Sequence, residues 1–422
     1  MQTVHHSNIA SKRILILGAN VETIPLILKA KEMGIFVIVT DHNPNAPAKK
    51  YADLAINING LDVLALVEFI KENNVDGVMV GVADRLVRPY IQICSLLHLP
   101  CYGTENQCDI LNDKFIFNKS IEKFSLSGIP SYELQEVLLD HQFEKELKFP
   151  MFVKPTDGNS GKGMSLCKTV DELLNAVGFA KVHSKKQSYL IERYMDCDDM
   201  FLYFTFIEGN VFLSATADRF THYGQGNVSR VCQYAVYPSK HKDLYLEKYH
   251  EKLLQFFSYL KLKNGVLMVS AFVEKDIMYF YDPGFRLQGE APNIHLDHLL
   301  NFNQLEFLIS IALNLSSKKI NKTVLEQKCA TIWILCGLGE IDQIVGLDKV
   351  KQFPYVYEIS QRLFKGDVIS ENMIGTEAQV FARIYLQTDS TGININQILN
   401  SIKILDNLGV NLVINNQIER KM

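Results

Sequence analysis

The hydrophobic positions in residues 13–105 follow two periods in turn. Short continuous apolar runs alternate with stretches in which apolar residues recur at helical spacing. Strands and helices that alternate in this way are typical of a parallel sheet covered by helices. The expected strands are 13–18, 36–41 and 75–81, and the expected helices are 23–34, 61–73 and 84–97. We therefore expect ligands at the carboxyl ends of these strands, which carry Gly18-Ala19-Asn20, Asp41 and Asp84.

The pattern changes after about residue 105, where most apolar runs are strand-like and follow one another closely. A helix is expected at 112–128, and strands at 151–153 and 164–167 flank a glycine-rich loop. Further expected elements are a helix at 171–180, strands at 189–192, 202–208, 211–218, 230–237, 266–273 and 277–282, a helix from 302, strands at 331–335 and 380–386, and a helix at 395–408. This part is predicted to be α+β with mostly antiparallel strands.

Length and composition limit the classes of function. A chain of 422 residues is too long for one ordinary core, so several domains are expected. The net charge of −4 argues against general binding of polyanions such as nucleic acids. None of the eight cysteines forms a Cys-x-x-Cys pair, which argues against zinc and against a disulfide framework. The first residues are polar and offer no apolar segment for a signal peptide or a membrane span, so we expect a cytoplasmic protein.

Residues 149–164 are the most informative segment for function. A short apolar strand delivers Lys154 into a loop that contains Gly158, Ser160, Gly161, Lys162 and Gly163. Glycines let backbone N–H groups approach anionic oxygens, and lysines supply positive charge. The loop is not a P-loop, because Thr156 stands where the first glycine of that motif belongs. A hairpin that folds over phosphates and an ordinary glycine-rich turn both remain open at this point.

The first 105 residues offer a weaker alternative, which is a nicotinamide-dependent oxidoreductase. Asp41 stands at a plausible spacing for a ribose contact. However, Gly18 is followed by Ala19-Asn20-Val21-Glu22, so the Gly-x-Gly-x-x-Gly fingerprint is missing. For Asp84, a helix N-cap is the simple explanation.

The order of Lys114, Lys154 with its glycine loop, Glu192, Asp199 and the segment 282–286 resembles the ATP-grasp superfamily. The resemblance covers nearly the whole chain and implies a combined α/β and α+β fold. It implies a Rossmann-like pre-grasp domain at 1–105, an ATP-grasp domain at 106–300 with a lid at about 148–205, and a C-terminal α+β domain at 301–422. The last domain is similar to that of biotin carboxylases and L-amino-acid ligases, and the first to that of the carbamoyl-phosphate synthase large subunit.

The resemblance also assigns roles at the nucleotide. Lys114 corresponds to the lysine at the α-phosphate and Lys154 to the second nucleotide lysine, while the loop with Gly158, Ser160, Gly161, Lys162 and Gly163 closes over the β- and γ-phosphates. Glu192 corresponds to the residue at the adenine amino group, with the Arg193-Tyr194 backbone at the adenine edge. Asp199 corresponds to the acid on the ribose hydroxyls. ATP is therefore the expected nucleotide.

At the reacting end, Arg219 corresponds to a basic phosphate contact and Arg286 to the arginine that faces the reactive phosphate and acyl group. Family members hold magnesium with an acid on the penultimate strand and with Glu and Asn of Glu-x-Asn-Pro-Arg. Here Ser270 replaces the first acid, Asp282 stands for the Glu, and Gly284 replaces the Asn. We expect Asp282 and Glu290 as Mg²⁺ ligands, with Asn293 as a further oxygen donor.

The implied function is an ATP-dependent carboxylate–amine (or thiol) ligase. It forms an acyl phosphate on a small carboxylate or amino acid and releases ADP and phosphate. Small-molecule carboxylates and amines are the expected partners, without nucleic acid or membrane, and a homodimer is the candidate assembly. The alternative is a degenerate ATP-grasp protein that binds ATP without turnover in a regulatory or scaffold role, which the replacements at Ser270 and Gly284 favour.

Overall fold

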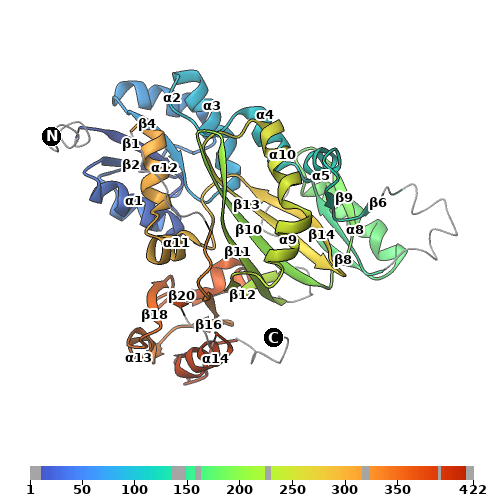
Figure 1. The fold of residues 1–422 in the computed structure, drawn as a ribbon. Helices are drawn as coiled ribbons and strands as arrows, with labels where there is room; N and C mark the ends of the chain where they lie inside the picture. Colours follow the sequence, from blue (N-terminus) through green and yellow to red (C-terminus); the bar gives the residue numbers. More distant parts are fainter. Residues whose placement is uncertain are drawn as a thin grey trace.

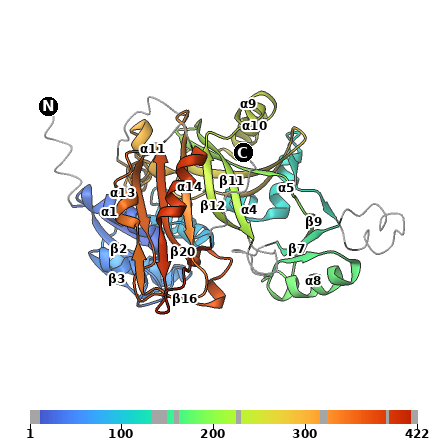
Figure 2. The ribbon, with the colours of Figure 1, turned by 90° about the horizontal axis from the view of Figure 1, so that it is seen from below.

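The computed structural model in Figure 1 describes residues 11–132, 134, 149–156, 163–223, 230–315, 324–387 and 391–414. Its elements form three groups, which are a parallel sheet near the N-terminus, a small lid and a large mixed sheet. Figure 2 shows the lid elements at one end of the molecule and the N-terminal and C-terminal elements at the other. Within the described ranges, no helix has both the length and the apolar composition needed to cross a lipid bilayer.

The first sheet confirms the predicted parallel arrangement. Its strands lie in the order β3-β2-β1-β4, with bounds β1 Arg13–Leu17, β2 Phe36–Thr40, β3 Leu54–Ile56 and β4 Gly77–Val80. The helices are α1 Ile24–Glu32, α2 Val63–Glu72 and α3 Val87–Leu97, and the predicted starts at 23 and 84 fall in short 3-10 turns. The short edge strand β3 was not predicted, because its apolar run has only three residues and is only partly buried.

The helix predicted at 112–128 is wrong in extent. The structure has α5 Lys114–Glu122 over the first part of this range, so the prediction is too long at its end, and a separate helix, α4 Glu105–Asn112, precedes α5. The break lies at Asp113, whose side chain accepts hydrogen bonds from the backbone N–H groups of Phe115 and Ile116 and so caps α5. After α5 the chain forms strand β5 Ser127–Gly128, which pairs with the large sheet.

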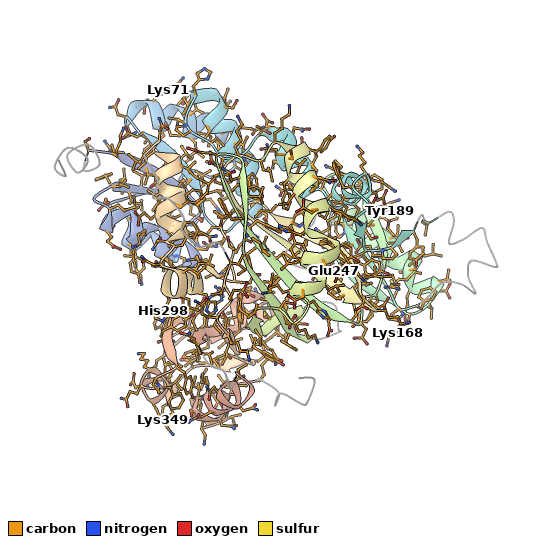
Figure 3. All side chains as sticks on the ribbon, in the orientation of Figure 1. Lys71, Lys168, Tyr189, Glu247, His298 and Lys349 are labelled. Carbon is orange, nitrogen blue, oxygen red and sulfur yellow. The ribbon has the colours of Figure 1, made fainter. Side chains whose placement is uncertain are left out.

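In the part of the lid that the structure describes, a four-stranded sheet is covered by one helix. The strand order is β6-β9-β7-β8, with bounds β6 Ser131–Tyr132, β7 Met151–Pro155, β8 Ser165–Cys167 and β9 Tyr189–Arg193, and the helix is α8 Val170–Val182. Met151, Val153 and Ile191 pack with Leu173 of α8 in a small core of their own. Lys168 and Tyr189 mark this part in Figure 3.

The large sheet has the strand order β18-β20-β15-β12-β11-β10-β13-β14-β5. Its other bounds are β10 Asp198–Ile207, β11 Asn210–Tyr223, β12 Arg230–Tyr237, β13 Gly265–Glu274, β14 Ile277–Gly284, β15 Cys329–Leu335, β18 Val356–Gln361 and β20 Val380–Gln387. Neighbouring strands are antiparallel, as predicted, except for the pair β14 and β5. Helices α9 Lys242–Lys248 and α10 His250–Leu260 cover one face (Figure 1), where Phe257 packs against Phe204 and Phe206.

The chain after residue 290 contributes to two groups. Helices α11 Asn293–Leu300 and α12 Gln304–Ala312 follow the large sheet, and α12 lies against α1 and β4 of the first sheet. A Cβ atom on Gly77 of β4 would come within 2.3 Å of the Ala312 carbonyl oxygen, so only glycine permits this approach. Strands β15, β18 and β20 instead extend the large sheet.

The smaller C-terminal elements pack on this extension. Their bounds are β16 Gly339–Glu340, β17 Gln343–Val345, α13 Leu347–Lys351, β19 Val368–Ile369, α14 Thr391–Ser401 and β21 Lys403–Leu405. The helix predicted at 395–408 is therefore too long at its end. Residues 403–405 leave the helical path because they pair with β17.

Candidate functional site

Lys154 and Glu192 form a buried ion pair in the lid. Strands β7 and β9 are antiparallel, with Lys154 opposite Leu190 and Glu192 opposite Phe152. This register places both charged side chains on one face of the lid sheet, while Val153 and Ile191 point to the core under α8. The Nζ of Lys154 lies 2.5 Å from Oε2 of Glu192, and the two residues are 8% and 3% exposed. The structure thus brings together two of the predicted nucleotide residues.

Asp199 lies in a polar cluster at the start of β10. It pairs in register with Arg219 of β11, and its Oδ2 lies 3.5 Å from Nη1 of Arg219. The hydroxyl of Tyr281, on β14, donates a hydrogen bond of 2.7 Å to Oδ1. Burial opposes the charge on Arg219, but the Asp199 carboxylate outweighs it and raises the pKa of Arg219 above its ordinary value. Asp199 and Arg219 are therefore held as a charged pair.

Asp282 lies within electrostatic range of three cations. It lies near the end of β14 with a φ of +49°, and its side chain is 60% exposed. Lys114, the first residue of α5, places Nζ at 3.6 Å from Oδ1 of Asp282. Desolvation by the surrounding protein opposes ionisation, but the charges of Lys114, Lys154 and Arg219 together lower the pKa of Asp282. Lys114 is thus the direct partner of this carboxylate, whereas Lys154 and Arg219 act on it from their own pairs with Glu192 and Asp199.

Arg286 lies across the junction with the first sheet. Its Nε and Nη2 donate hydrogen bonds of 2.5 Å and 2.7 Å to the two carboxylate oxygens of Asp84. The prediction that Asp84 serves as a helix N-cap is wrong, because Ala83 occupies the cap position and the Asp84 carboxylate is used by Arg286. This bidentate pair fixes the plane of the guanidinium. The third nitrogen, Nη1, donates a hydrogen bond of 2.8 Å to the backbone carbonyl of Leu287.

The predicted metal ligands are not joined into a cluster. Glu290 lies within electrostatic range of Arg286 and of Arg219. Ser270 is buried on β13 opposite Tyr281, beside Asp282. Among the described residues, no group of three or more His, Cys, Asp or Glu side chains could hold a metal ion. Asp282 offers an ionised, accessible oxygen ligand, which suits a magnesium ion held mainly by phosphate oxygens and water.

Part of the predicted lid loop lies outside the described residues, namely Gly158, Ser160, Gly161 and Lys162. Gly163 is described and has a φ of +74°, and a Cβ atom there would come within 2.6 Å of His183. At the predicted adenine edge, the backbone N–H groups of Arg193 and Tyr194 donate to the carbonyls of Pro130 and Pro150. These N–H groups are therefore occupied within the protein, and the adenine role of the two residues stays a prediction.

Asp41, the residue considered for contact with a nicotinamide ribose, holds the backbone of two loops in place. The carboxylate of Asp41 accepts hydrogen bonds from the backbone N–H groups of Ala19 at 3.1 Å and Asn43 at 2.9 Å. Asp41 therefore ties the turn after β1 to the end of β2, which disfavours the oxidoreductase alternative.

Sequence reasoning missed a charged cluster between the first sheet and the C-terminal strands. Glu22, in the turn after β1, pairs with Arg362 and lies 3.7 Å from Arg383. Glu377 pairs with both arginines, at 3.1 Å from Arg362 and 2.8 Å from Arg383. Although burial opposes its ionisation, the charges of Arg383, Arg362 and Arg219 lower the pKa of Glu377, so this cluster adjoins the Asp199 pair. The available signal was a lone arginine in the otherwise apolar strand 380–386.

Comparison with known proteins gives one family match and several relatives. Residues 113–198 match the family described as "Carbamoyl-phosphate synthase L chain, ATP binding domain". The formate-dependent phosphoribosylglycinamide formyltransferase of Prochlorococcus marinus (strain MIT 9301) is 28% identical over 207 residues, which are 46% of this chain and 51% of that protein. The chain thus matches about half the length of this relative.

Solved structures cover more of the chain. The L-amino acid ligase from Bacillus licheniformis has a TM-score of 0.76 at 16% identity and covers 94% of this chain and 99% of its own. The biotin carboxylase domain dimer of Hydrogenobacter thermophilus 2-oxoglutarate carboxylase, in complex with MgADP, ADP and bicarbonate, has a TM-score of 0.75 at 15% identity, over 93% of this chain and 90% of its own. The chain therefore has the ATP-grasp fold over nearly its whole length, and residues 113–198 within that fold match the carbamoyl-phosphate synthase type of ATP-binding domain.

Proposed function

We propose that the chain is an ATP-dependent ligase that joins a small carboxylate to an amine or thiol through an acyl phosphate and releases ADP and phosphate. The observation that carries this proposal is the set of ion pairs of Lys114 with Asp282, Lys154 with Glu192 and Arg219 with Asp199, whose cations all lie within electrostatic range of Asp282. Cations held on three separate elements suit a triphosphate, because a triphosphate spreads its charge over several oxygens.

The nucleotide would lie between the lid and the large sheet. Lys154 and Lys114 would bind its phosphates, and Asp199 would accept hydrogen bonds from the ribose hydroxyls. Glu192, at the lid hinge, would approach the adenine amino group with Arg193 and Tyr194. The buried pair of Lys154 and Glu192 would then exchange part of its contact for contacts with ATP. The loop with Gly158, Ser160, Gly161, Lys162 and Gly163 would close over the phosphates.

Asp282 is the best-supported magnesium ligand, and Glu290 is proposed as a second one. A bound magnesium ion would neutralise charge on the phosphate oxygens. Arg219 and Arg286 would stabilise the negative charge that develops as a carboxylate attacks the γ-phosphate. The bidentate contact with Asp84 orients Arg286 for this task, and so Asp84 acts as a positioning residue.

The cluster of Glu22, Arg362, Glu377 and Arg383 would form the acceptor side of the site. Two carboxylates and two guanidinium groups balance one another there. A substrate that carries both an ammonium group and a carboxylate, such as an amino acid, can pair with one carboxylate and one guanidinium group of this cluster, so that no buried charge is left unpaired. This balance supports amino acids as the first substrates to test.

The test is release of ADP and phosphate by the full chain with MgATP. A panel of amino acids and small carboxylates is supplied singly and in pairs, with and without an amine. We expect release that depends on the substrate pair and that falls by roughly 10²-fold in Lys114→Met. Lys119→Met is the matched control, because Lys119 lies exposed on the same helix and pairs only locally with Glu122.

The second candidate is an ATP-binding protein without turnover, which is favoured by Ser270 and Gly284 in place of two family ligands. Tight binding of ATP with no release stimulated by any substrate would support this candidate and contradict the ligase. Binding of NAD but not of ATP would contradict both.

We also propose a division into domains at 1–105, 106–300 and 301–422, a cytoplasmic location and a homodimer. All eight cysteines are free thiols, which supports a reducing compartment. Light scattering of the purified chain would test the dimer. Limited proteolysis, with mapping of the cut sites, would test the domain boundaries.

A further inference from the structure

Lys186 reaches from the lid to the start of helix α5. It lies in the turn between α8 and β9, and its Nζ donates a hydrogen bond of 2.8 Å to Oδ2 of Asp113, which lies 73 positions earlier. Oδ1 of the same carboxylate accepts hydrogen bonds from the backbone N–H groups of Phe115 and Ile116 and caps α5. The side chain of Asp113 is 12% exposed, and that of Lys186 is 60% exposed. One largely buried carboxylate is thus shared between the lid and the helix that begins with Lys114.

The turn that carries Lys186 is fixed to the strand that carries Lys154. Inside the turn, the N–H of Ser188 donates a hydrogen bond of 3.1 Å to the hydroxyl of Ser184, which is buried. The hydroxyls of Ser188 and Thr156 share a hydrogen bond of 2.5 Å, and the N–H of Thr156 donates to the carbonyl of Ser188 at 3.4 Å. Thr156 comes directly after β7 and two positions after Lys154. The position of this turn and the position of Lys154 are therefore coupled.

The contact of Lys186 with Asp113 lies at the end of β9 that is farther from the large sheet. Strand β9 runs from Tyr189 to Arg193 and then leads into β10. At the sheet end, Nη2 of Arg193 donates a hydrogen bond of 2.9 Å to Oε2 of Glu274 on β13. A strand of this length spans roughly 13 Å, so two separated ion pairs tie the lid to the rest of the molecule. Figures 1 and 2 both show α5 beside β9. Because the lid has a core of its own, such contacts across its boundary decide how firmly it is held.

We propose that Lys186 and Asp113 form a clasp that holds the lid against α5 and so sets the position of Lys154 relative to Lys114, which rests on the nucleotide site proposed above. The clasp connects the turn fixed to Lys154 with the residue that caps the helix of Lys114. With the clasp made, both lysines are held in place before a triphosphate arrives, so less motion has to be frozen when it binds. Lys186 is a positioning residue, because it acts on the nucleotide through these two lysines.

Three substitutions separate the clasp from the other roles of its residues. Lys186→Met removes the charge and keeps much of the length of the side chain, whereas Lys186→Arg keeps both the charge and the donors. Asp113→Asn removes the charge that Lys186 pairs with but keeps an oxygen for the cap of α5, because asparagine caps helices about as well as aspartate. Since Lys186 is exposed, loss of the clasp should shift the equilibria that depend on it by roughly 1.5- to 5-fold.

The first measurement is hydrogen exchange of the full chain without nucleotide, read by mass spectrometry on peptides that cover residues 181–190. Lys186→Met and Asp113→Asn should each raise the exchange rate of this turn by roughly 1.5- to 5-fold. The double variant should exchange no faster than the faster of the two, because either change alone already removes the contact. Lys186→Arg should keep the rate of the wild type. Lys168→Met is the matched control, because Lys168 is exposed on the same lid, and it should also keep that rate.

The second measurement is the affinity for ATP with magnesium, by calorimetry on the same proteins. Lys186→Met and Asp113→Asn should weaken ATP binding by roughly 1.5- to 5-fold, and Lys186→Arg and Lys168→Met should not. Equal exchange rates in Lys186→Met and Lys168→Met would overturn the clasp, whether or not ATP binds. Faster exchange in Lys186→Met with unchanged ATP affinity would overturn its positioning role and leave the nucleotide site intact. If the wild type bound no ATP, the proposed function would fail, and the positioning role with it. The Lys186 variants decide the matter even if Asp113→Asn does not fold.

Discussion

Replacement of Lys154 by methionine tests the buried ion pair at the centre of the lid. The Nζ of Lys154 lies 2.5 Å from Oε2 of Glu192, and neither residue is more than 8% exposed. Methionine keeps much of the length of the side chain but removes the charge, which leaves the Glu192 carboxylate buried without this cation. The loss of one partner from a buried pair costs about 3–5 kcal/mol. We expect the lid to lose stability by this amount.

Hydrogen exchange followed by mass spectrometry is the suitable assay, because the lid has a core of its own and can open separately from the large sheet. Peptides that cover β7 and β9 should lose protection in Lys154→Met, while peptides from β13 and β15 should not. A second change, Glu192→Gln, added to Lys154→Met should restore most of the protection, because it removes the uncompensated charge.

Lys168→Met provides the matched control. Lys168 lies exposed on the same lid (Figure 3), so its replacement should change stability by no more than about 0.5 kcal/mol. If Lys154→Met were no more disruptive than Lys168→Met, the reasoning about the buried pair would be refuted. A double variant as poorly protected as the single one would refute it equally.

Three further predictions concern other parts of the molecule. Burial lowers the pKa of His295 to about 3 from 6.5, so the stability of the fold is full above pH 6.5 and falls below it as the unfolded chain takes up a proton. The free energy of unfolding in urea should fall from pH 7 to pH 5 by about 2 kcal/mol more in the wild type than in His295→Gln. Equal falls in the two proteins would contradict this prediction. Asp282→Asn should raise the magnesium concentration needed for half-maximal ADP release by at least roughly 10-fold. The control Asp276→Asn, at the exposed turn beyond β13, should leave this concentration unchanged. If Asp282→Asn also left it unchanged, Asp282 would not be a magnesium ligand. Arg286→Lys keeps the charge but loses the bidentate contact with Asp84, so kcat should fall by roughly 10²-fold with the urea midpoint nearly unchanged; wild-type kcat would show that the fixed guanidinium plane is not needed.

The fold could be predicted well where local pattern and tertiary burial agree. Strands 13–18, 36–41 and 75–81 each contain a continuous apolar run because both faces of a parallel sheet are covered, and all three are confirmed. The errors fall where a distant strand decides the outcome. Residues 127–128, at the end of one predicted helix, pair as β5 with β14, and β17 draws residues 403–405 out of another predicted helix.

The candidate site shows the same division. The order of Lys114, Lys154, Glu192, Asp199 and Arg286 along the chain was enough to predict the ATP-grasp fold, which the comparisons bear out. Their partners could not be predicted from that order. Neither the contact of Arg286 with Asp84, across 202 positions, nor the cluster around Arg383 leaves a local pattern.

The sequence by itself therefore determined which cations, glycines and carboxylates the chain carries, and in what order. It could do so because strand and helix periodicity is local and because the spacing of a phosphate loop is local too. Only the tertiary structure decided that Lys114 pairs with Asp282, within electrostatic range of Lys154 and Arg219, and that Glu192 is paired inside the lid. The physical reason is that charge interactions depend on distance through space, and strand register and packing between sheets set that distance.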